Sequence, residues 1–106
     1  MIHCFFGEDT QKARQAAREL FEQLRNDNKS ATASYFDDVL FDISAATDAF
    51  TSENLFGGQN ILYFDGILEH ADGETFYRTI LQKTEHDVII REVAPSKDLL
   101  DRKSVV

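Results

Sequence analysis

Runs of apolar residues alternate with helical patterns along the chain. Three runs hold consecutive apolar residues and predict buried strands at residues 1–6, 61–64 and 86–93. The first run is apolar on both alternating faces except at His3, which is typical of a strand that is buried on two sides. A shorter aromatic stretch at residues 34–37 predicts a further strand.

Apolar residues at helical spacing predict one long helix and two shorter ones. The long helix covers residues 10–26, and either Asp9 or Thr10 is available as its N-cap. The shorter helices are predicted at about residues 44–51 and 73–83. Because strands alternate with helices, we expect a three-layer α/β fold with a mostly parallel sheet flanked by helices.

The end of the chain gives a weaker pattern. After Pro95 the remaining residues can start a further helix with Ser96 as its cap, and the tail from about residue 97 is the one segment that we expect to be loose. A length of 106 residues accommodates one domain with one modest core. We therefore expect residues 1–106 to form a single domain.

Charge and composition narrow the class of protein. The chain has 11 Lys and Arg against 19 Asp and Glu, and residues 30–77 contain neither Lys nor Arg, so the middle of the chain is expected to form an acidic face. A formal charge of −8 repels nucleic acid and anionic lipid. A single cysteine permits no internal disulfide, and no apolar run approaches the roughly 18 residues that span a bilayer. We expect a cytoplasmic protein that binds neither nucleic acid nor membrane.

The turn after the first predicted strand is the natural place for a phosphate site. Walker A and dinucleotide-binding turns need several glycines, and Gly7 stands alone there. Glu8 and Asp9 would also repel a phosphate and are better suited to cap the following helix. We therefore expect no nucleotide cofactor and no nucleotide hydrolysis.

The acidic residues suggest one alternative function, whereas the cysteine and the histidines predict no further site. Glu8 and Asp9 could join Asp65 around Mg²⁺ in a receiver-like phosphoacceptor domain, in which Lys97 only loosely matches the required lysine. Cys4 lies within an apolar run, where core packing is expected rather than nucleophilic catalysis. The three histidines share no ligand spacing with one another or with Cys4, so no metal site is expected.

The pair Leu55–Phe56 lies between a polar stretch and two glycines. Two large apolar side chains on a short turn can serve as a hydrophobic plug for a partner's pocket. They can equally pack onto the sheet. The residues alone leave both interpretations open.

The order of several motifs resembles the N-terminal domain of the delta subunit of the bacterial DNA polymerase III clamp loader. The opening IHCFFGEDTQKARQAARELFEQL is similar to the start of that family, and ENLFGGQNILYFDG occupies the place of its Ser-Leu-Phe-Gly motif, with Asn54 where Ser is usual. The later stretch DVIIREVAPSKDLLDRK is similar to the family's strand and the polar helix after it. The resemblance extends over about the whole chain.

This resemblance implies a degenerate P-loop domain of the AAA+ type without its own catalytic activity. It implies that Leu55 and Phe56 enter a pocket of the ring-shaped sliding clamp and help to open it in DNA replication, while Gly57 and Gly58 set the turn. Other clamp-loader subunits are implied as further partners. The family's lid and collar domains do not fit within 106 residues and are expected to be absent. A different possibility is a general protein-interaction scaffold with a degenerate P-loop fold, whose acidic middle meets a basic partner.

Overall fold

The protein is represented by a computed structural model, which describes residues 2–7, 9–29, 31–51, 60–80, 86–93 and 104–105. The elements in chain order are β1 (Ile2–Phe6), α1 (Thr10–Asp27), β2 (Ala33–Asp37), α2 (Ile43–Thr51), β3 (Ile61–Asp65), the 3₁₀ turn η1 (Ile67–Glu69), α3 (Gly73–Ile80), β4 (Asp87–Glu92) and β5 (Ser104–Val105). Each strand and helix expected before Pro95 has a counterpart here, although residues 81–83 of the third expected helix lie outside the described residues.

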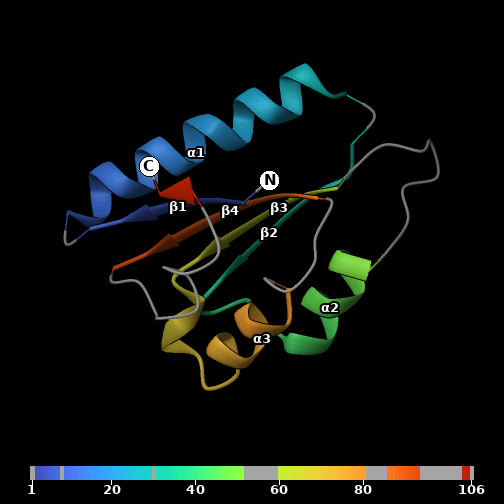
Figure 1. Ribbon diagram of the computed structural model, residues 1–106. Helices are drawn as coiled ribbons and strands as arrows, with labels where there is room; N and C mark the ends of the chain where they lie inside the picture. The colour runs from blue at the N-terminus through green and yellow to red at the C-terminus, as the bar shows by residue number, and fades with distance from the viewer. Residues whose placement is uncertain are drawn as a thin grey trace.

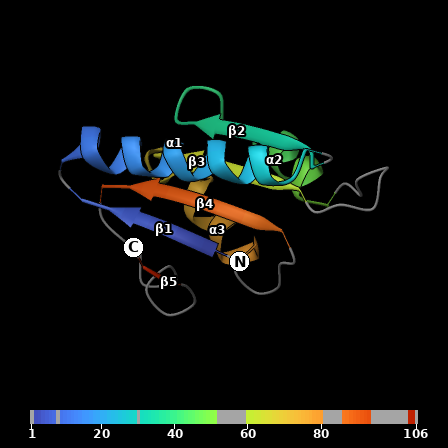
Figure 2. The ribbon, with the colours of Figure 1, turned by 90° about the horizontal axis from the view of Figure 1, so that it is seen from above.

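The strands form one parallel sheet in the order β2-β3-β4-β1-β5. In Figure 1, α1 covers one face of this sheet, and α2 and α3 cover the other. Figure 2 shows the same sheet from above, with β2 at one edge and the short β5 at the other. The expected three-layer α/β architecture with a parallel sheet is confirmed.

A hydrophobic core lies on each side of the sheet. On the side of α2 and α3, the Phe64 ring stacks on Phe36 at 5.5 Å and contacts the edge of Phe76 at 5.0 Å. On the side of α1, the ring of Phe21 meets that of Tyr63 at 5.4 Å. Because β3 contributes to both cores, all five of its residues are buried, as its apolar sequence predicts.

The structure decides which residue caps α1 and how far β1 is buried. The Asp9 carboxylate accepts a hydrogen bond from the Lys12 backbone N–H at 3.1 Å, so Asp9 is the N-cap of α1. In β1, only Cys4 is fully buried, so the expectation that the whole strand is buried on two sides is wrong. The reason is its position, because within the described residues the sheet continues beyond β1 with the two-residue β5 alone.

The described end of the chain adds a short strand that the sequence did not predict. Ser104 and Val105 pair in parallel with His3 and Cys4 and so add β5 to the sheet. The predicted cap Ser96 lies outside the described residues. No helix in the described part of the chain is both long enough and apolar enough to cross a membrane.

Candidate functional site

Leu55 and Phe56, which are predicted to contact a partner, lie outside the described residues, as do Gly57 and Gly58, which are predicted to set the turn. The structure does describe the two ends of the segment that carries them. Helix α2 ends at Thr51, and Asn60 immediately precedes β3. Contacts between side chains and backbone hold these two ends together.

Hydrogen bonds through Asn60 and His86 join the end of α2 to the start of β3. The Asn60 side chain, only 3% exposed, donates from its amide to the carbonyl of Ala49 at 3.2 Å. The Asn60 backbone N–H donates to Nδ1 of His86 at 3.3 Å. Nε2 of His86 therefore carries the proton, and it lies 2.6 Å from the carbonyl oxygen of Phe50. We call these four residues the loop anchor.

The loop anchor fixes where the predicted contact segment leaves and rejoins the domain. Both ends of the segment lie where the parallel strands begin, that is, at the amino ends of the strands. Asn60 directly precedes β3 and His86 directly precedes β4. The sequence did not predict the anchor, because its two polar residues are 26 positions apart. The only sequence signal is that a polar residue lies just before each of two apolar runs, Asn60 next to Ile61 and His86 two positions before Val88.

Replacing Asn60 by alanine tests the anchor. The variant loses the amide that satisfies the Ala49 carbonyl, so we expect the free energy of unfolding to fall by about 1–2 kcal/mol. Urea denaturation followed by circular dichroism measures this change. The variant Thr32→Ala, at an exposed position before β2, is the control and should stay within about 0.5 kcal/mol of the wild type. An unchanged stability of Asn60→Ala would contradict the anchor.

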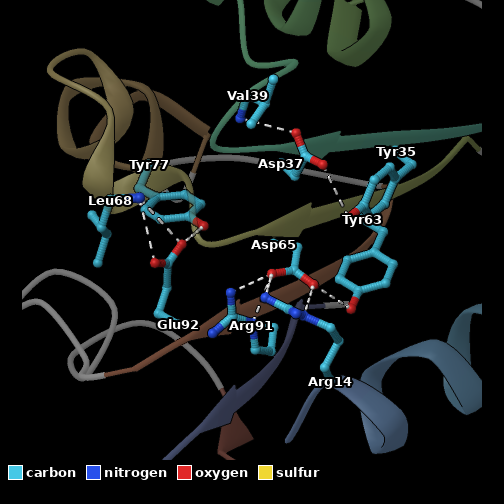
Figure 3. Close-up of polar contacts among 10 residues, drawn as sticks. All are labelled: Arg14, Tyr35, Asp37, Val39, Tyr63, Asp65, Leu68, Tyr77, Arg91 and Glu92. Carbon is cyan, nitrogen blue, oxygen red and sulfur yellow. Dashed lines mark hydrogen bonds and ion pairs between the residues drawn. The ribbon is translucent and has the colours of Figure 1, made fainter. Parts of the chain in front are cut away.

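A second polar cluster surrounds Asp65, at the carboxyl ends of the parallel strands (Figure 3). Asp65 is the last residue of β3 and is 2% exposed. Its carboxylate accepts hydrogen bonds from Arg14 Nε at 3.1 Å, from Arg91 Nε at 2.8 Å and from the Tyr63 hydroxyl at 3.0 Å. The Arg91 Nη2 group makes a further ion pair with the same carboxylate. Helix α1 and strands β3 and β4 are thus joined through one side chain.

The electrostatics of this cluster favour a structural role. Burial, and after it the charge of Asp65, raise the pKa of the Tyr63 hydroxyl, which therefore stays protonated and donates. The hydrogen bond to Asp65 raises the pKa of Arg14. Both oxygens of the Asp65 carboxylate have cationic or hydroxyl donors. In this arrangement they are not free to bind Mg²⁺ or to accept a phosphoryl group.

The other acids of the receiver-like alternative are not brought to Asp65 by any described contact. The Asp9 side chain caps α1, and Glu8 lies outside the described residues. Within the residues that the structure describes, no group of three or more His, Cys, Asp or Glu side chains is placed to hold a metal ion. Cys4 is a fully buried thiol in the core, as its apolar surroundings predicted.

A third polar site, not anticipated from the sequence, is formed by Glu92 at the end of β4. Its side chain is 2% exposed and accepts a hydrogen bond from the Tyr77 hydroxyl and another from the Leu68 backbone N–H at 3.3 Å. Burial raises the pKa of Glu92 to about 7. Burial likewise holds the pKa of Tyr77 well above its ordinary value, so the hydroxyl remains the donor. Figure 3 shows this pair beside the Asp65 cluster.

Comparison of the chain with protein-family models, with curated proteins and with solved structures gives no significant match.

Proposed function

We propose that this domain is a non-catalytic module of the clamp-loader delta type, which binds a DNA sliding clamp through Leu55 and Phe56 and helps to open it. The observation that carries the proposal is the loop anchor. It holds the two ends of the segment that contains the Leu-Phe-Gly sequence at one edge of the sheet, by hydrogen bonds through Asn60 and His86. A contact segment with a fixed base can transmit force between the partner and the domain.

The strand order argues against a receiver-like domain. In the observed order, β1 lies between β4 and β5. A receiver-like sheet follows the order 2-1-3-4-5, in which the first strand lies between the second and the third. The proposal therefore retains the AAA+-type assignment.

The Asp65 cluster supports binding without catalysis. Ligands of open α/β sheets bind at the edge where parallel strands end, and Asp65 lies at that edge. Here its carboxylate is neutralised internally by Arg14 and Arg91. The Asp65 carboxylate is thus part of an internal ion-pair cluster. An ATPase of this architecture would hold a metal ion and a phosphate at this position.

In the proposed mechanism, binding alone opens the clamp. Burying a leucine and a phenylalanine in an apolar pocket releases about 3–6 kcal/mol before ordering costs are subtracted. This energy opens the ring only to the extent that the pair binds the opened interface more tightly than the closed one. No covalent bond is made or broken in this step.

Calorimetric titration against the sliding clamp from the same source tests the proposal. The double variant Leu55→Ala, Phe56→Ala should bind at least about a hundredfold more weakly than the wild type, because both hot-spot side chains are removed. The matched control is Val39→Ala, Leu40→Ala, which truncates an exposed aliphatic pair at other positions of the chain and should bind like the wild type.

Two results would contradict this assignment. A folded wild-type domain that does not bind the clamp would exclude the proposed function. A double variant that loses its folded circular dichroism spectrum would instead identify Leu55 and Phe56 as residues that stabilise the fold.

A further inference from the structure

Strand β2 has an unpaired edge with a defined set of backbone groups. In the described part of the chain it pairs only with β3. The Ile61 N–H donates to the Thr32 carbonyl at 2.8 Å, and hydrogen bonds of a parallel ladder alternate along the strand. The N–H and C=O groups of Ala33, Tyr35 and Asp37 therefore face away from β3. This edge can accept a further strand.

The edge of β2 lacks the features by which proteins usually prevent strand addition. Its sequence, ASYFD, contains no lysine and no proline, and its register with β3 is unbroken from Ala33 to Asp37, so no bulge twists it away. The strand lies at the rim of the sheet, with the turn toward α2 beyond its end (Figure 2).

A rigid turn next to this edge presents two exposed aliphatic side chains. The Asp37 carboxylate accepts hydrogen bonds from the backbone N–H groups of Val39 at 3.0 Å and Leu40 at 2.7 Å. Phe41 is buried and packs against the ring of Phe76 at 5.5 Å. The turn is thus held on both sides, and Val39 and Leu40 are left 82% and 62% exposed. An apolar contact is available there without reorganisation.

Charge indicates which partner fits this surface. Asp38 and Asp42, which flank Val39 and Leu40, are exposed. They belong to residues 30–77, where nine acids occur without a Lys or Arg. A basic segment is attracted to the end of this surface that carries Asp38 and Asp42, whereas a second copy of the domain would bring the same acids together.

We propose that the free edge of β2 and the Val39–Leu40 turn bind an extended segment of a partner protein in which aliphatic and basic residues alternate. The segment continues the sheet through the backbone groups of Ala33 and Tyr35, and one of its aliphatic side chains packs on the turn. Its basic side chains face Asp38. This surface is formed by residues other than those of the proposed clamp contact, so either can fail without the other.

The test uses synthetic peptides of about six residues as probes, a length that matches one strand. One peptide alternates Val with Lys, a second alternates Val with Glu, and a third repeats the first with an N-methyl group on every backbone nitrogen. Each is titrated to millimolar concentration into the ¹⁵N-labelled protein. We expect the Val-Lys peptide to shift the amide signals of residues 33–40, and the other two peptides to leave them unchanged.

Two charge-reversal variants test whether Asp38 contributes to binding of the peptide. Asp38→Lys should weaken binding of the Val-Lys peptide by about tenfold or more, whereas Glu69→Lys, an equal charge change at an exposed position of η1, should weaken it by less than about threefold. Equal binding of the N-methylated peptide would overturn strand addition. The proposal would be overturned if the amide signals did not shift, or if the shifts were confined to other acidic residues. A dimer that forms through β2 without peptide would overturn it as well.

Discussion

Replacing Asp65 by alanine is expected to lower the free energy of unfolding by about 3–5 kcal/mol, because the change leaves the guanidinium of Arg91 buried without its counter-ion. Arg91 is 4% exposed, and its Nη1 group has no hydrogen-bond partner among the residues that the structure describes. Space around it is also limited, because a Cβ on Gly66 would lie 2.7 Å from Arg91 Nη2. The guanidinium has little room to move toward water after its partner is removed.

Two further variants separate the contributions to this cluster. Arg14 is 44% exposed, so Arg14→Ala should cost less than about 1 kcal/mol. The double variant Asp65→Leu, Arg91→Met removes both buried charges and should recover at least about half of the loss, since apolar groups of similar volume avoid the desolvation cost. Urea unfolding measures all three. A loss below about 1 kcal/mol for Asp65→Ala would show that Arg91 finds other partners.

The order of strands and helices could be predicted because it depends on local patterns. Consecutive apolar residues such as those in Ile61–Asp65 indicate a strand buried on both faces, and the spacing of Ala17 and Phe21 indicates a helix with one buried side. The strand order could not be predicted, because it depends on which strands pair along their edges in three dimensions, and local patterns do not show this. For the same reason β1 was expected to be more buried than it is.

The polar sites were predicted less well than the fold. Asp65 was identified as a residue of interest at the end of a strand, but its partners Arg14 and Arg91 are 51 and 26 positions away. A carboxylate at a strand end is compatible with a metal ligand, a turn or an ion pair, and only the distant cations decide among these. Leu55 and Phe56 remain a prediction, since they lie outside the described residues.

The stability of the protein is expected to fall as the pH rises from about 4.5 to about 7, through the titration of Glu92. Burial raises the pKa of this carboxyl from its ordinary value of 4.5 to about 7, and the Tyr77 and Leu68 donors and the charge of Arg91 oppose this effect only in part. Between these two values the folded protein holds a proton that the unfolded chain has released. Folding is therefore favoured at the lower pH, and this advantage is lost as the pH rises through the pKa of the folded state.

The variant Glu92→Gln isolates this contribution from those of the other carboxyl groups. Its amide oxygen can accept the same hydrogen bonds from Tyr77 and Leu68, but the side chain does not titrate. We expect the wild type to lose about 3 kcal/mol relative to this variant between pH 4.5 and pH 7, at about 1.4 kcal/mol per pKa unit. Urea unfolding across this range, with the Glu92 carboxyl followed by ¹³C NMR, measures both quantities. A difference between wild type and variant that does not change with pH would mean that Glu92 titrates alike in the folded and unfolded states.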